Sequence, residues 1–155
     1  MKKTTDQISK FFLTLAISFS CFNLGANAAN PISVTFFGSK AVGGYDTVAY
    51  HQNKKAIKGS NSHKTVWKGA TWLFANSENL KAFQEKPEKF APAYGGYCAW
   101  AAADNKLVKA DPTIFDLQDG RLFLNYNKKT RTDWKLDRKG MIKRGDRNYP
   151  RLIAE

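Results

Sequence analysis

The chain has 155 residues, and its 25 Lys and Arg against 13 Asp and Glu give a formal net charge of +12. An aromatic content of 14%, with four tryptophans, excludes a disordered chain and favours a single packed domain. The positive charges match no nucleic-acid-binding motif, which excludes that class and favours an anionic surface or an acidic protein as partner.

The first 28 residues have the order of a secretory signal peptide. Three lysines precede and flank an apolar run at 11–22, which has the length of a signal-peptide core and is too short to span a bilayer. Residues 26–28 (Ala-Asn-Ala) then supply the small-x-small pattern that a signal peptidase needs. We therefore expect cleavage before Ala29 and an exported protein, periplasmic or secreted, with no transmembrane segment.

The cysteine count predicts a single thiol in the exported protein. Cleavage removes Cys21, whose alternative use as a lipid attachment site is disfavoured because residues 18–20 (Ser-Phe-Ser) lack the leucine of a lipoprotein signal. Cys98 then remains alone, which excludes a disulfide within the chain. A lone thiol in an oxidising compartment needs a reason, such as burial, a metal ion or a bond to another chain.

After a short lead-in over 29–40, residues 41–155 are predicted to form one domain that contains three β-hairpins. Alternating β-favouring residues and intervening turns place the hairpins at 47–51 with 56–59, at 65–67 with 70–74, and at 113–117 with 121–126. The second and third hairpins have two-residue loops that contain glycine, Lys68-Gly69 and Asp119-Gly120.

A helix is predicted after the second hairpin. Asn76 or Ser77 caps it, Leu80 and Phe83 share its apolar face, and Pro87 ends its regular part. One more turn is expected before the chain reaches a Gly-Gly loop at 95–96.

A second helix is predicted near the C-terminus. Thr132 or Asp133 is expected to cap it, and Trp134, Met141 and Ile142 are expected to lie along it. Together these elements indicate an α+β fold, a small single domain of β-hairpins packed on one or two helices.

Several segments, in this order, resemble the exported YHS-domain proteins. They are 44–50 (GYDTVAY), 67–74 (WKGATWLF), 90–92 (FAP), 94–99 (YGGYCA) and 119–126 (DGRLFLNY). The resemblance covers nearly all of residues 41–152 and implies a YHS/treble-clef-like core. It also implies metal handling, with copper as the candidate ion. This chain lacks the clustered cysteines of the cysteine-rich branch, which argues against a structural zinc site.

Three interpretations of Cys98 remain open at this stage. The residue is a buried small hydrophobe, or a thiolate ligand for a soft ion such as Cu(I), or a reactive thiol for exchange or nucleophilic attack. A Gly-Gly turn precedes it, so its backbone can approach a ligand closely. The case for an enzyme depends on Cys98 alone, because no second catalytic residue and no cofactor-binding motif is visible.

The two histidines differ as candidates for a metal site. His51 ends the first predicted strand and is the most plausible helper of Cys98, whereas His63 fits a solvated loop. Met141 is a further soft donor that fits core packing better, and Asp46 fits the capping of its own turn better than metal binding. The candidate metal ligands are therefore Cys98 and His51.

Three function hypotheses follow from these observations. The leading one is an exported metal-binding or metal-chaperone-like module. The alternative is a non-catalytic interaction domain with a structural cysteine and a basic face for its partner. A thiol-dependent enzyme is the third.

Overall fold

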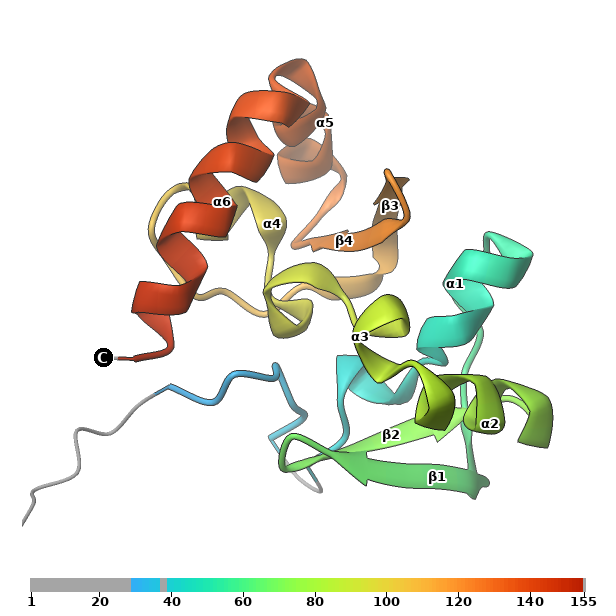
Figure 1. Ribbon diagram of the computed structural model, residues 1–155. Helices are drawn as coiled ribbons and strands as arrows, with labels where there is room; N and C mark the ends of the chain where they lie inside the picture. The colour runs from blue at the N-terminus through green and yellow to red at the C-terminus, as the bar shows by residue number, and fades with distance from the viewer. Residues whose placement is uncertain (1–28, 37–38, 155) are drawn as a thin grey trace, which may run out of the picture.

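The computed structural model describes residues 29–36 and 39–154 (Figure 1). The predicted signal peptide over 1–28, including Cys21, lies outside the described residues. Within the described ranges, no helix has both the length and the apolar character that crossing a membrane requires.

The described residues form an α+β domain with two separate hairpins (Figure 1). In chain order the elements are η1 (Val42–Gly44), α1 (Thr47–Asn53), β1 (Ser60–Trp67), β2 (Ala70–Phe74), α2 (Ser77–Glu85), α3 (Pro87–Phe90), η2 (Ala93–Gly96), α4 (Ala99–Ala103), β3 (Asp111–Gln118), β4 (Arg121–Asn125), α5 (Lys128–Leu136) and α6 (Arg138–Leu152). Strands β1 and β2 form one antiparallel pair, and β3 and β4 form the other. The predicted fold class is confirmed, with more helices than the sequence indicated.

The first predicted hairpin is wrong, because residues 47–51 belong to helix α1. The Oδ1 atom of Asp46 accepts hydrogen bonds from the backbone N–H groups of Val48 at 2.9 Å and Ala49 at 3.1 Å. These bonds satisfy free donors at the start of the helix and outweigh the β preference of the residues that follow. Of the expected hairpin, only an isolated bridge between Tyr45 and Lys58 is present in the described part.

The second and third predicted hairpins are confirmed. Trp67 pairs with Ala70 across the Lys68-Gly69 turn, and Gln118 pairs with Arg121 across the other. All four central turn residues have positive φ, between 48° and 75°, which matches the twist that tight hairpins need. The two-residue loops in the sequence were therefore sufficient to place both hairpins.

Helix α2 packs against the β1–β2 hairpin through an aromatic cluster. Asn76 caps the helix by accepting the N–H of Asn79 at 2.8 Å, as predicted. On its inner face, the ring of Phe83 lies 4.9 Å from that of Trp72 and 5.0 Å from that of Phe74, measured between centroids. A hairpin followed by a packed helix is therefore present over residues 60–85.

The C-terminal region contains two helices instead of one, and neither begins at the predicted cap. Asn127 caps α5 in a reciprocal capping box with Thr130, and Asp137 caps α6 by accepting the N–H of Gly140 at 3.0 Å. Thr132 and Asp133 lie inside α5, so the predicted start was wrong. The break falls at Asp137 because its side chain satisfies a donor at the start of the next helix.

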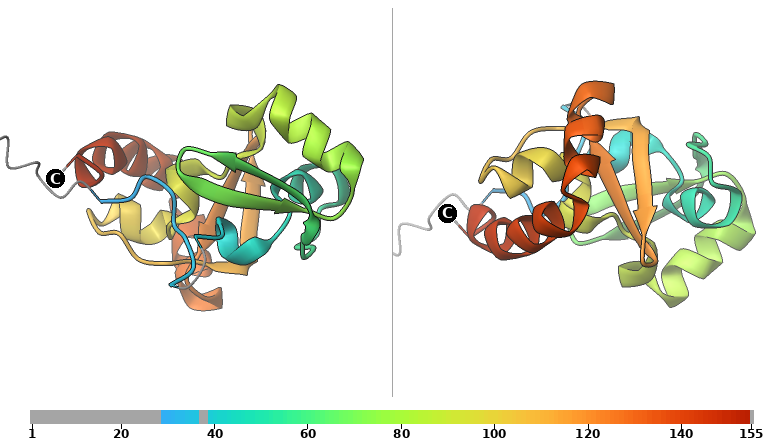
Figure 2. Two further views of the ribbon diagram at one scale, coloured as in Figure 1. Left: turned by 90° about the horizontal axis from the view of Figure 1, so that it is seen from below. Right: turned by 90° about the horizontal axis from the view of Figure 1, so that it is seen from above.

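A second hydrophobic cluster joins these helices to β4. Its buried members are Tyr94, Ala99, Ala102, Phe123 and Trp134. Helix α6 packs on α4, where Asn148 donates hydrogen bonds to the carbonyl oxygens of Ala102 and Ala103, both at 3.1 Å. The two further views place the α4–α6 pair at one end of the domain and α2 at the other, with β3 and β4 between them (Figure 2).

The lead-in crosses over both parts of the domain. Ile32 is buried in the first cluster, and the N–H of Ser33 donates to the carbonyl of Gly95 at 2.9 Å. Gly95 has φ +60°, and a Cβ atom at this position would overlap the carbonyl oxygen of Pro31. The lead-in therefore packs against the domain, and its close approach to residue 95 requires a glycine there.

Candidate functional site

Cys98 lies at the start of α4, where it is 1% exposed. Its Sγ accepts the backbone N–H of Tyr126 at 3.3 Å and lies 3.8 Å from Oδ1 of Asn125. Its own N–H donates to the carbonyl of Val108 at 2.8 Å. The thiol is therefore held among neutral backbone and amide groups.

Asn125 completes this contact between α4 and β4. Its side chain is fully buried, and its Oδ1 also accepts the N–H of Trp100 at 3.3 Å. The amide thus joins the first turn of α4 to the end of the strand. Sequence reasoning missed Asn125, since 27 residues separate it from Cys98 and no local pattern connects them.

His51 lies on α1 in different surroundings. Its ring makes an edge contact with Phe90, at 5.4 Å between centroids, and its Nε2 is buried without a hydrogen-bond partner. Burial lowers the pKa of His51 below its usual value, and the positive charges of Lys54 and Lys89 lower this pKa further. The ring is consequently neutral near physiological pH.

These surroundings do not fit a soft-metal centre built by Cys98 and His51. Throughout the described ranges, no hydrogen bond or ring contact joins the two residues. No group of three or more His, Cys, Asp or Glu side chains in that part of the chain is arranged to hold a metal ion. Among the described residues, the one potential metal-ligand atom hydrogen-bonded to the thiol is the amide oxygen of Asn125, which soft ions bind weakly.

The remaining candidate donors also have structural surroundings. Sδ of Met141 accepts a hydrogen bond from Arg144 at 3.1 Å, and its side chain packs on the second hydrophobic cluster. His63 is half-buried on β1, instead of in the predicted loop. Asp46 is fully buried and uses its second oxygen to accept from the N–H of Ala75 at 2.8 Å and from the side-chain amide of Asn79 at 2.7 Å.

Helix α6 carries a line of exposed positive charge, which we call the basic stripe. The stripe comprises Lys139, Lys143, Arg147 and Arg151, four residues apart along the helix and all exposed. With 3.6 residues per turn, these positions lie on the side of α6 opposite Gly145, which packs against Tyr94. All four residues are exposed, although Arg147 and Arg151 also donate hydrogen bonds to Oδ1 of Asn148, at 3.4 and 2.9 Å.

The charges of the basic stripe are not neutralised by neighbouring carboxylates. Other basic residues are paired: Arg121 with Asp146 at 2.7 Å and Arg131 with Asp116 at 2.6 Å. No ion pair involves a residue of the stripe in the part of the chain that the structure describes. The sequence indicated a basic tail here, but only the helix shows which charges share a face.

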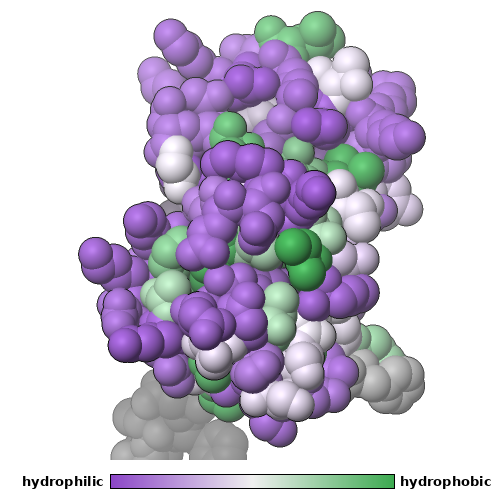
Figure 3. All heavy atoms as spheres, turned by 90° about the vertical axis from the view of Figure 1, so that its right-hand side faces the viewer, coloured by the Kyte–Doolittle hydropathy of each residue, from purple (hydrophilic) through white to green (hydrophobic). Residues whose placement is uncertain are grey.

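The exposed apolar residues do not suggest a large protein interface. The face shown in Figure 3 is mainly hydrophilic, with small hydrophobic groups scattered over it. The most exposed large apolar side chains, Phe36, Leu136 and Val66, come from separate segments of the chain and are 86%, 82% and 72% exposed. The basic stripe is accordingly the main candidate binding surface.

The fold and these surfaces define a small α+β module with a buried thiol and a basic helix. Residues 48–94, from α1 to the start of η2, match the YHS domain family, so this part of the chain carries a YHS domain. The matched region contains His51 and ends before Cys98 and α6. No curated protein and no solved structure matches the chain.

Proposed function

We propose that this YHS-domain protein is a non-catalytic interaction module, exported from the cytoplasm, that binds an anionic phospholipid surface through α6. The observation that supports this function is the basic stripe, four exposed cations along one side of a helix that form no ion pair within the described residues. A cation near an anionic membrane contributes about 1 kcal/mol to binding, so four together are enough for reversible attachment.

The geometry of the stripe favours a flat partner. Its first and last residues lie about 18 Å apart along the helix, at about 1.5 Å per residue. The apolar side of α6 is packed on α4, so it is not free to insert into lipid. Binding is then mainly electrostatic and weakens as salt shortens the screening length.

Cys98 has a structural role in this proposal. A nucleophilic thiol needs a base or a cation beside it, but the groups that contact Cys98 are an amide oxygen and a backbone N–H. Its burial and its link to β4 instead support a role in fixing the start of α4.

Metal handling is the second candidate function, because the YHS match and the family resemblance favour it. The residues around Cys98 do not supply a ligand set, so this candidate rests on the family and not on the geometry. Copper is the ion that the resemblance implies, with Cys98 and His51 as the candidate ligands.

Vesicle binding tests the leading function. The purified protein is sedimented with phosphatidylglycerol–phosphatidylcholine vesicles and with phosphatidylcholine vesicles at low and high salt. We expect binding to the anionic vesicles alone, and its loss when all four stripe residues are changed to Gln. The matched control removes the same charge from exposed positions elsewhere, namely Lys55, Lys64, Lys81 and Lys86, and should retain most of the binding. Equal loss in both variants would show that net charge, not the stripe, drives attachment.

Alkylation of Cys98 separates the structural and metal roles. The native protein is treated with iodoacetamide, with and without one equivalent of Cu(I), and the label is located by peptide mass. A structural thiol is labelled only in denaturant and is unaffected by copper. Rapid labelling of native protein that Cu(I) suppresses would instead support the metal site, and a His51→Ala variant would then test the second ligand.

A further inference from the structure

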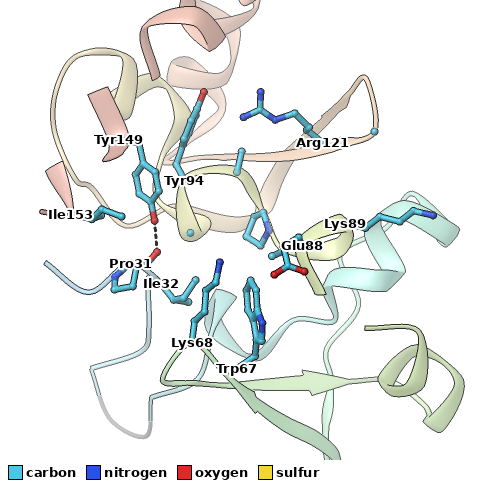
Figure 4. Close-up of a pocket in the computed structure, with 15 residues that line it drawn as sticks. Pro31, Ile32, Trp67, Lys68, Glu88, Lys89, Tyr94, Arg121, Tyr149 and Ile153 are labelled. Carbon is cyan, nitrogen blue, oxygen red and sulfur yellow. Dashed lines mark hydrogen bonds between the residues drawn. The ribbon is translucent and has the colours of Figure 1, made fainter. Parts of the chain in front are cut away.

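A cavity of about 380 Å³ lies between the two ends of the domain (Figure 4). The size falls in the range of small-molecule sites. Its walls come from segments far apart in the chain, represented by Ile32 of the lead-in, Trp67 at the end of β1, Arg121 at the start of β4 and Tyr149 of α6. The pocket forms only when all four segments have folded together.

Two aromatic side chains give the pocket rigid walls. The ring of Trp67 is half-buried and contacts the rings of Trp72 at 5.5 Å and Phe83 at 5.8 Å. On the other side, the hydroxyl of Tyr149 donates to the carbonyl of Pro31, and its ring lies 5.6 Å from that of Tyr94. Because neighbours fix both rings, a flat apolar ligand can bind without first ordering them.

The charges around the pocket favour an anion, and Lys68 is the cation available to bind it. Arg121 is already paired with Asp146 through two hydrogen bonds, at 2.7 and 3.0 Å. Lys68 makes no ion pair in the described part of the chain, and its Nζ lies 4.3 Å from the centre of the Trp67 ring. Figure 4 shows the Lys68 side chain directed into the pocket, whereas Lys89 extends away from it.

We propose that this pocket binds a small aromatic anion, a ligand with an apolar ring system and one carboxylate or sulfonate group. The ring system lies between Trp67 and Tyr149, and the anionic group pairs with Lys68. The carboxylate of Glu88, which also lines the pocket, would repel a second negative charge, so one anionic group is the preferred number. No residue of the basic stripe lines this pocket, which makes the proposal independent of vesicle binding.

Two fluorescent probes of nearly the same shape test the proposal. 8-Anilinonaphthalene-1-sulfonate is an aromatic anion, and N-phenyl-1-naphthylamine is the same ring system without the sulfonate. We expect one equivalent of the anionic probe to bind the folded protein more tightly than the neutral probe. Lys68→Gln should lower the affinity for the anionic probe about fivefold and leave the affinity for the neutral probe unchanged. The matched variant Lys89→Gln should change neither.

Further variants keep the test decisive. Trp67→Leu should lower the affinity for both probes. If that variant fails to fold, Lys68→Gln, a substitution in an exposed turn, still tests the proposal. The proposal is overturned if neither probe binds, if the neutral probe binds as tightly, or if Lys68→Gln has no effect. The proposal is also overturned if the variant with all four stripe residues changed to Gln no longer binds the anionic probe while Lys68→Gln binds it as wild type does. That result would place the anion-binding site on α6.

Discussion

Asp46 shows how one buried side chain determines local structure. Its two oxygens accept four hydrogen bonds, which link the start of α1 to the loop before α2 and to Asn79 on α2. We predict that Asp46→Ala lowers the free energy of unfolding by about 3 kcal/mol, because it leaves buried donors without a partner. Urea denaturation measures the change. Asp104→Ala, which removes only an exposed carboxylate paired with Lys106, should stay within about 0.5 kcal/mol of wild type.

His51 predicts a pH dependence of stability. Its pKa is lowered in the folded protein by burial and then by Lys54 and Lys89, so below about pH 6.5 the unfolded chain binds more protons than the folded one. The stability is therefore fully present above that pH and falls as the pH drops below it.

Urea unfolding between pH 7.5 and 5 tests this dependence. His51→Gln should flatten the loss of stability, whereas His63→Gln, which changes the other histidine, should leave the wild-type slope. An unchanged slope in His51→Gln would contradict the assignment of the buried neutral ring.

Single residues also show where sequence reasoning reached its limit. Cys98 stood out as the lone thiol, but its role depends on Asn125 and Tyr126, which the fold brings to it from the far end of β4. His51 was expected at the end of a strand, and its actual neighbour Phe90 belongs to α3. In both cases the deciding partners are long-range contacts, which no local pattern contains.

At the scale of elements, the packing of α2 on the β1–β2 hairpin was predicted and leads to a stability test. Phe83 is 1% exposed and lies against Trp72 and Phe74. Phe83→Ala should lower the free energy of unfolding by about 3–5 kcal/mol, since it empties an aromatic position in the core. Lys81→Ala, at an exposed position of the same helix, serves as the control and should cost less than about 0.5 kcal/mol. A wild-type denaturation midpoint in Phe83→Ala would contradict this packing.

Predictability of the elements depended on how local their signals were. Lys68-Gly69 and Asp119-Gly120 placed two hairpins, because a tight turn specifies its own register. Helix α1 was misassigned because β-favouring residues follow a capping Asp, and the cap decided the outcome. The start of α5 has a local signal in Asn127 and Thr130, which form a capping box, whereas the predicted caps Thr132 and Asp133 lie inside the helix.

At the scale of the whole molecule, the candidate surfaces arise only from the assembled fold. The basic stripe needs a continuous α6 packed on α4, and the cavity needs the lead-in, two hairpin turns and α6 together. The charge of the tail and the aromatic content were visible in the sequence. Which of these residues face solvent, and which enclose a pocket, follows from how the two ends of the domain meet.

Export is the hypothesis that applies to the whole chain, and cleavage before Ala29 is compatible with every contact described above. The hydrogen bonds of the lead-in begin at Asn30, whose carbonyl accepts the hydroxyl of Tyr97 at 3.0 Å. We predict that protein isolated from its own cells has an intact mass that starts at Ala29 or Asn30. Ala28→Glu should block processing, because the peptidase requires a small residue at that position, and should give a mass that begins at Met1. A wild-type mass that retains Met1, or that carries lipid on Cys21, would contradict a cleaved signal peptide.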